Sequence, residues 1–165
     1  MTDLESRSDV HDLVVDFYRE IVFDDLLAPV FEEVAEVDWA AHIPRLIDYW
    51  CRVLFGEPSE TGAILGPHQH VHDLAPFRGE LFDRWNRLWT EAIDRRWAGP
   101  NAERARTHAA RISGVLSRRL TGTSWEPPTA GDAGAPSGGA VPATALITRS
   151  RARPPSRSSR RPDRR

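Results

Sequence analysis

The sequence predicts an all-α domain followed by a basic tail, and three observations carry this prediction. Apolar residues recur at intervals of three and four in several stretches before Gly122, which is the period of an amphipathic helix. No alternating run indicates a strand. The charge also changes near Gly122: residues 1–122 hold 14 Arg against 21 acids, a net of −7, whereas residues 123–165 hold 8 Arg against 3 acids, a net of +5.

The first two helices are expected before the middle of the chain. One starts after Ser8 or Asp9, and the second covers 39–55 with Asp38 as its candidate N-cap. A short turn at Pro29 separates them. The apolar stripe of the first helix consists of Val10, Leu13, Val14, Phe17, Tyr18, Ile21 and Val22.

Two further helices are expected at about 79–97 and about 102–120. Gly99 and Pro100 stop the earlier one, and Asn101 is a candidate cap for the later one. The domain organisation is therefore a helical domain over 1–122 and a tail over 123–165. The tail is rich in Pro, Gly, Ser and Arg and poor in large apolar residues, so we expect it to be disordered.

The stretch GPHQHVHDLAPF, residues 66–77, holds three of the six histidines of the chain: His68, His70 and His72. Gly66, Pro67 and Pro76 predict an irregular segment here, a loop or a single helical turn. A three-histidine zinc site is a weak interpretation, because no HExxH or carboxylate–histidine pattern accompanies it. The better interpretation is a loop that presents one histidine to a metal that other groups hold, since haem iron needs only one proximal protein ligand.

Composition excludes several classes of protein. No apolar run approaches the ~20 residues of a membrane span, and the acidic N-terminus is unlike a signal peptide. The single cysteine, Cys51, rules out an intramolecular disulfide and is expected in the core. We expect a cytoplasmic monomer with no membrane partner. Nucleic-acid binding by the tail is not expected, because the tail lacks interleaved aromatic residues.

Several motifs together resemble a known family. They are Phe17-Tyr18, PVF at 29–31, WAAHIPRLIDYW at 39–50, LFDRW at 81–85 and AGPNAERARTHAARI at 98–112. In this order they resemble the truncated haemoglobins, most closely group III, over about residues 8–120. The resemblance implies a truncated globin fold, a two-over-two helical sandwich around haem b. The four expected helices would correspond to the globin B, E, G and H helices.

The resemblance also implies roles for individual residues on the distal side of the haem. Tyr18 matches the B-helix tyrosine, and His42 the distal E-helix histidine. Trp85 matches the G-helix tryptophan, so these three side chains would stabilise a bound ligand. Leu46, one turn after His42, matches the apolar residue under the ligand. Phe31 matches the phenylalanine that packs on the porphyrin edge.

The proximal iron ligand is assigned by interval. His72 lies 13 residues before Trp85, which is close to the interval that the family resemblance implies. His70, at 15 residues, stays open as the alternative, and His68, at 17, is interpreted as a bystander. The apolar residues expected to contact the haem near this ligand are Val71, Leu74 and Phe77.

The implied function is binding of dioxygen, nitric oxide or other small ligands at haem iron. Several distal donors imply slow release of oxygen. Redox or detoxification chemistry, nitric oxide dioxygenation or peroxide reduction with an unidentified reductase, is therefore favoured over bulk oxygen transport. Whether the protein is an enzyme stays open at this stage. The alternative hypothesis is a haem-free helical interaction module with a basic nucleic-acid-binding tail.

Overall fold

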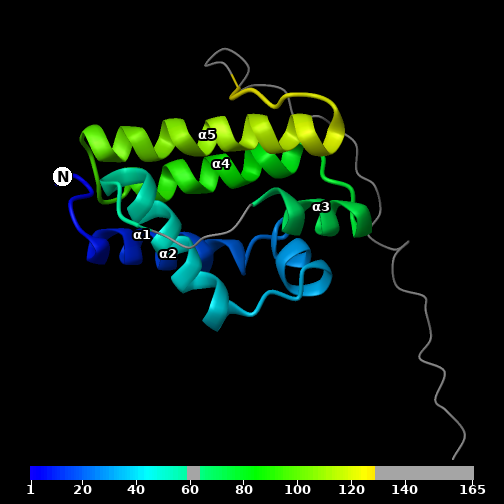
Figure 1. Cartoon of the computed structure of the whole chain (residues 1–165), viewed down its shortest axis with the longest axis horizontal. Coiled ribbons are helices and arrows are strands. Elements are labelled where there is room, and N and C mark those ends of the chain that lie inside the picture. The colour runs from blue at the N-terminus through cyan, green and yellow to red at the C-terminus, as the bar shows by residue number, and fades with distance from the viewer. Residues whose placement is uncertain (59–63, 129–165) are drawn as a thin grey trace, which may run out of the picture. The chain divides into compact units, whose positions relative to one another are not determined.

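The structure is a computed structural model that describes residues 1–58 and 64–128. The chain divides into two compact units, Met1–Ala133 and Gly134–Arg165, and every described residue belongs to the first. Within that unit, α1 and α2 lie on one side and the paired helices α4 and α5 on the other (Figure 1). The elements are α1 (Arg7–Ile21), a π-helix η1 (Val30–Val34), α2 (Trp39–Phe55), α3 (Leu65–Leu74), α4 (Gly79–Asp94) and α5 (Pro100–Thr121).

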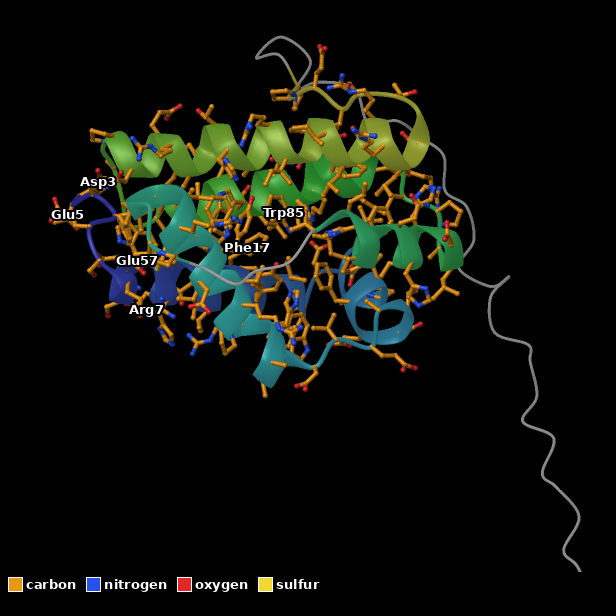
Figure 2. All side chains as sticks on the ribbon, in the orientation of Figure 1. Asp3, Glu5, Arg7, Phe17, Glu57 and Trp85 are labelled. Atoms are coloured by element: carbon orange, nitrogen blue, oxygen red, sulfur yellow. The ribbon has the colours of Figure 1, made fainter. Side chains whose placement is uncertain are left out.

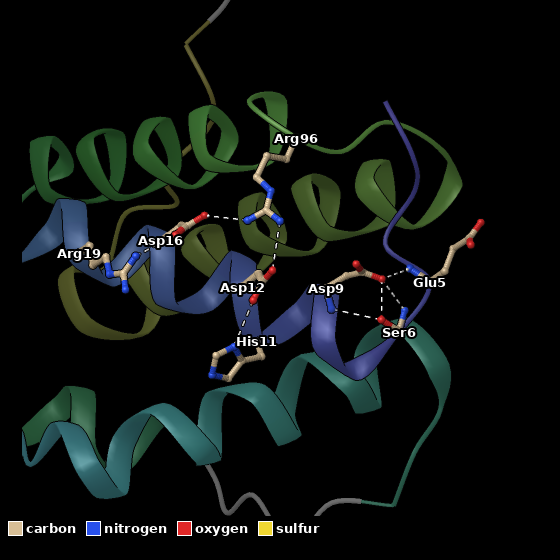
Figure 3. Close-up of polar contacts among 8 residues, drawn as sticks. All are labelled: Glu5, Ser6, Asp9, His11, Asp12, Asp16, Arg19 and Arg96. Atoms are coloured by element: carbon tan, nitrogen blue, oxygen red, sulfur yellow. Dashed lines mark hydrogen bonds and ion pairs between the residues drawn. The ribbon is translucent and has the colours of Figure 1, made fainter.

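The all-helical fold class is confirmed, but α1 begins earlier than the sequence predicted. Ser6 is its N-cap rather than a residue near Ser8, because a capping box forms there: the Ser6 hydroxyl accepts a hydrogen bond from the Asp9 backbone N–H at 3.2 Å. The Asp9 carboxylate accepts from the Ser6 backbone N–H at 2.9 Å in return, as Figure 3 shows. The helix therefore gains one more turn of capped backbone.

The start of α5 also differs from the prediction. The helix begins at Pro100, and Asn101 is its second residue rather than its cap. The cap comes from far away in the sequence, because the Asp3 carboxylate accepts hydrogen bonds from the backbone N–H groups of Asn101 at 2.9 Å and Ala102 at 2.8 Å. A carboxylate at a helix N-terminus also complements the helix dipole. The N-terminal arm is thereby tied to α5.

The predicted N-cap of α2 is confirmed. The Asp38 carboxylate accepts from the Ala40 backbone N–H at 3.0 Å, and Pro44 lies inside the helix. The helix ends at Gly56, whose φ of 74° is the left-handed conformation that a glycine adopts without strain.

The prediction that residues 66–77 form a loop or a single turn is wrong. Leu65–Leu74 form the ten-residue helix α3, so all three histidines are helical. Gly66 and Pro67 do not break it, because they lie in its first turn, where a backbone N–H has no acceptor within the helix. Pro76 comes two residues after the helix ends and is compatible with that end.

The core fills the space between α1, α2, α4 and α5. Phe17 and Trp89 are fully buried, with ring centroids 5.0 Å apart in an edge-to-face arrangement. Phe17 also meets Trp85 at 5.2 Å, and Figure 2 shows the two near the middle of the helical unit. At the surface, Arg96 donates to Asp12 at 3.1 Å and to Asp16 at 3.2 Å, which ties the end of α4 to α1 (Figure 3). These contacts fix the relative position of α1 and α4.

The described chain continues a few residues beyond α5. Gly122 caps the helix with a φ of 79°, and the Trp125 indole N–H then donates to the Asp83 carboxylate at 2.6 Å. The remainder of the predicted tail, 129–165, lies outside the described residues. Among the residues that the structure describes, no helix has both the length and the apolar character that crossing a bilayer requires.

Candidate functional site

The Tyr18 side chain, on α1, lies at the centre of an aromatic cluster. Its ring centroid is 5.6 Å from that of Trp39, 5.8 Å from that of His42 and 5.9 Å from that of Phe31. Burial raises the pKa of the phenol well above its ordinary value, so the hydroxyl is neutral at physiological pH. The cluster thus presents a protonated hydroxyl inside an apolar enclosure.

The Trp85 side chain partly opposes that rise in pKa. An indole nitrogen can only donate, so toward Trp85 the Tyr18 oxygen can only accept and its own hydrogen remains available. The two side chains come from α1 and α4, and Phe17 packs against both rings, at 4.8 Å from Tyr18 and 5.2 Å from Trp85. This packing orients the phenol toward one side of the cluster.

His42, on α2, completes the group of three predicted distal side chains. Burial lowers the pKa of His42, and the charges of His68 and Arg45 lower it further, so the imidazole is neutral near pH 7. Leu46 is half-buried one turn further along α2. The structure therefore brings Tyr18, His42 and Trp85 together from three helices, and their roles toward a ligand remain a proposal.

Across from His42 lies α3, whose hydrogen bonds distinguish its histidines. The Nδ1 atom of His68 lies 2.7 Å from the backbone carbonyl oxygen of Ile64. A carbonyl oxygen can only accept, so Nδ1 carries the hydrogen, and in the neutral imidazole Nε2 then keeps its lone pair. A hydrogen bond of this kind, from the other ring nitrogen to a carbonyl, is what orients a metal-binding histidine. His68 has the tautomer of a metal ligand.

His72 lies one turn later on the same face of α3 but has the opposite tautomer. Its Nδ1 accepts a hydrogen bond from the Phe77 backbone N–H at 3.0 Å. In a neutral imidazole the hydrogen must then be on Nε2, which leaves no lone pair there for a metal. These contacts do not favour the preference for His72 that the interval to Trp85 suggested.

His70 lies on the opposite face of α3, two residues from each of the others. It lines an open pocket of about 510 Å³ with Leu74, which is 60% exposed. The other residues lining this pocket, from η1 and the turn after it, are Glu33, Val34, Ala35 and Glu36. Within 1–58 and 64–128, no group of three or more His, Cys, Asp or Glu side chains is arranged to hold a metal ion. The three histidines therefore do not converge.

Apolar side chains of α2, α3 and the segments beside them are only partly covered by the rest of the protein. Among the described helices, α3 packs only on α5 and η1, and neither α3 nor η1 buries a single residue. The half-buried apolar residues that face other parts of the unit include Phe31, Trp39, Ile43, Leu46, Ile64, Val71, Phe77, Leu81 and Trp85. The imidazoles of His42 and His68 are close enough to interact electrostatically, and Nε2 of His68 is free. These imidazoles and the half-buried apolar residues, which we call the apolar border, fit a planar iron cofactor.

Two of these residues were not identified from the sequence. Trp39 stacks on Phe31 with centroids 5.9 Å apart, although the sequence suggested only a helix face for it. His68 was interpreted as a bystander. The signal that could have identified it is the spacing of four between His68 and His72, which places both on one face once the segment is read as a helix.

This arrangement defines a class of fold: two pairs of helices, α1 with α2 and α4 with α5, and a short helix α3 between α2 and α4 in the chain are the arrangement of a truncated globin. The crystal structure of a group III truncated hemoglobin from Campylobacter jejuni matches the described fold with a TM-score of 0.63 and 24% identity, over 73% of this chain and 95% of that one. The truncated haemoglobin fold predicted from the sequence is therefore confirmed.

Sequence comparison agrees with the fold. A group 3 truncated hemoglobin of Campylobacter jejuni is 30% identical over 81 residues, which are 47% of this chain and 61% of that relative. No protein-family model matches the sequence. The chain is thus similar in both sequence and structure to the group III truncated haemoglobins, as its motifs indicated.

Proposed function

We propose that this protein binds haem b between α2 and α3, with His68 as the axial iron ligand, and that it binds dioxygen, nitric oxide or similar small ligands on the side of Tyr18, His42 and Trp85. The observation that carries the proposal is the Nδ1 hydrogen bond of His68 to the Ile64 carbonyl at 2.7 Å, which leaves Nε2 free beside the apolar border. The similarity to a protein named as a hemoglobin supports the choice of cofactor.

Bound haem would supply an iron atom able to bind diatomic ligands and to exchange electrons. The chain itself supplies an imidazole on one side and hydrogen-bond donors on the other. The half-buried Phe31, Leu46 and Phe77 support the proposal as apolar side chains that would pack against the bound group. Burial by such side chains would exclude water from the iron.

Tyr18 is the main donor of the distal side. The Trp85 indole can only act as a donor toward the Tyr18 oxygen, so the Tyr18 hydrogen is free to donate to a ligand. His42 is neutral and carries one hydrogen of its own. Donors held in a buried site stabilise the partial negative charge of a polarised diatomic ligand, which slows its release.

Slow release favours chemistry over transport. We therefore propose nitric oxide dioxygenation or peroxide reduction, with electrons from a reductase whose identity is open, as the physiological role. Mixing the oxygenated protein with nitric oxide in a stopped-flow spectrometer tests the first of these. Stoichiometric nitrate at a rate far above that of oxygen release is expected. Displacement of oxygen without nitrate would contradict it.

Haem titration of the purified full chain tests the cofactor and its ligand. We expect one haem per chain with a Soret band, loss of that stoichiometric binding in His68→Ala, and retention in the matched variants His72→Ala and His70→Ala. Circular dichroism checks that each variant keeps its helices. A helical protein that shows no Soret band after haem addition would contradict the haem proposal. Loss of haem binding only in His72→Ala would show that His72, not His68, is the ligand.

A further inference from the structure

The wall of the distal pocket continues as a stack of tryptophans through the core. Trp85 and Trp89, one turn apart on α4, have ring centroids 5.8 Å apart and planes inclined by 11°. Trp89 in turn stacks on Trp50 of α2, at 4.5 Å and 20°. Three nearly parallel indoles in sequence are unusual in a core, where edge-to-face pairs are as common as stacks. The tryptophan stack, Trp85–Trp89–Trp50, starts beside Tyr18 and passes through the interior.

The stack ends at a half-exposed tyrosine. The Tyr49 ring lies 5.5 Å from Trp50, and its hydroxyl oxygen lies 2.6 Å from Nε2 of His108 on α5. An Arg111 guanidinium nitrogen lies 3.1 Å from Nδ1 of the same imidazole. Because arginine only donates, Nδ1 accepts, Nε2 carries the hydrogen, and His108 donates to the Tyr49 oxygen. The phenolic hydrogen of Tyr49 is then free to pass to water.

The surface around Tyr49 is positively charged. The Arg52 guanidinium lies 5.4 Å above the Tyr49 ring centroid, and Arg111 lies on the other side beside His108. Both arginines are exposed. The charges of Arg111 and Arg52 add to burial in lowering the pKa of His108, which keeps this imidazole neutral. An anionic small molecule is therefore attracted to the place where the stack reaches solvent.

We infer that Trp85, Trp89 and Trp50 form an electron route by which an oxidant in the distal pocket takes electrons from Tyr49, so that Tyr49 is a surface site for oxidation of anionic one-electron donors. The inference rests on the proposed function for its oxidant, hydrogen peroxide acting on bound haem. Reduction of one hydrogen peroxide to two waters takes two electrons and two protons, so the route is used twice: each time one electron passes from Trp85 to the oxidant and is replaced in turn from Trp89, Trp50 and Tyr49. The Tyr49 hydroxyl loses its proton to water, and the donor then returns one electron and one proton to the phenoxyl radical.

Tyr49 is the end of the route because it is half-buried, whereas Trp89, Trp50 and Tyr18 are buried. Trp89 is fully buried and Trp50 is 4% exposed, so a positive charge left on either indole has no water to take its proton. Tyr18, which lies beside Trp85 at the other end of the stack, is buried, so it has little water to take its proton. Tyr18 and Tyr49 are also the only tyrosines of the whole sequence, which makes each the control for the other.

Electron paramagnetic resonance after rapid freezing tests the route in the haem-loaded full chain mixed with hydrogen peroxide. We expect a tyrosyl radical signal that is lost in Tyr49→Phe and kept in Tyr18→Phe. Ascorbate should quench that signal faster than neutral hydroquinone, and Arg52→Gln with Arg111→Gln should remove the difference. A tyrosyl signal that survives Tyr49→Phe, or that disappears only in Tyr18→Phe, would overturn the inference.

A second arm does not depend on haem and so separates this inference from the proposed function. Azide radicals made by pulse radiolysis oxidise tryptophan in the haem-free full chain, and the transfer from tryptophan to tyrosine is followed by absorbance. We expect a tyrosyl absorbance to grow as the tryptophan radical decays, and to be absent in Tyr49→Phe. Unchanged kinetics in Tyr49→Phe would contradict the route even if haem binding is established.

Discussion

The two ends of the helical unit differ in how far they are packed. Around Trp89 the protein is dense: Trp89 and Phe17 are fully buried, and α1, α2, α4 and α5 all contribute to that core. Within α3 and η1, which form the sparse end, no residue is buried, and Leu65 and Leu74 are exposed. A dense core specifies its own structure, whereas a half-covered apolar surface beside a free imidazole nitrogen needs a further group to cover it. The difference locates the candidate haem site independently of any motif.

Truncation of Trp89 should have the largest effect on the free energy of unfolding, because it removes packing from the dense end, the core around Trp89. Trp89→Ala removes a fully buried indole, so we expect a loss of about 3–5 kcal/mol in the free energy of unfolding. Urea unfolding of the haem-free chain measures it. Phe77→Ala is the matched variant of the sparse end, and because Phe77 is only half-buried its cost should be about 1 kcal/mol or less. Equal costs would refute the comparison.

Haem addition should selectively stabilise the sparse end, that is, α3 and η1. A ligand present at about 100 times its Kd stabilises a fold by about 2.7 kcal/mol. Amide hydrogen exchange should slow mainly in α3 and η1, with little change in the parts of α4 and α5 around Trp89. Exchange followed by mass spectrometry, with and without haem, makes this visible. Uniform protection of all helices would show that the two ends are one cooperative unit.

Removal of the Tyr18 hydroxyl tests ligand stabilisation at the boundary between the dense core and η1, where the Tyr18 ring contacts Phe17 and Phe31. Tyr18→Phe keeps the ring among Phe17, Phe31 and Trp39 and deletes only the donor. A hydrogen bond worth about 1.4 kcal/mol corresponds to a tenfold change. We therefore expect oxygen release to quicken by about tenfold, followed by flash photolysis or stopped-flow mixing. An unchanged rate would remove Tyr18 from the ligand-stabilising group.

The smallest expected effect is a pH dependence in the dense end. Burial, with Arg111 and Arg52, lowers the pKa of His108 below its ordinary value of 6.5. The unfolded chain then binds a proton more readily than the folded one, so stability should be present above pH 6.5 and fall as the pH drops toward the folded pKa. Urea midpoints at a series of pH values should fall less in His108→Gln than in the parent. Identical slopes would show that His108 does not contribute.

Most of the fold follows from apolar periodicity. The predicted range 39–55 is that of α2, and the predicted start at 79 is that of α4, which however ends at Asp94 rather than 97; wide apolar faces identify both helices. The caps of α1 and α5 were missed for a physical reason. Asp3 lies almost one hundred residues before the helix that it caps, and local patterns carry no information on such contacts.

The site was predictable on one side only. Tyr18, His42 and Trp85 lie on strongly periodic helices, so their faces, and hence their meeting, could be inferred. The proposed ligand His68 on α3 could not be inferred in this way, since α3 buries no residue and its apolar pattern is weak. The choice between His68 and His72 depends on which ring nitrogen bonds to the backbone, and no spacing rule reports a tautomer.

Chemical rescue tests the central claim most directly, namely that α3 holds haem through His68. In His68→Gly, the full chain should bind haem weakly, and free imidazole should restore both the affinity and the axial-histidine spectrum by filling the vacated position. The matched variant His72→Gly should bind haem without imidazole. The opposite result, imidazole dependence in His72→Gly and normal binding in His68→Gly, would contradict the account.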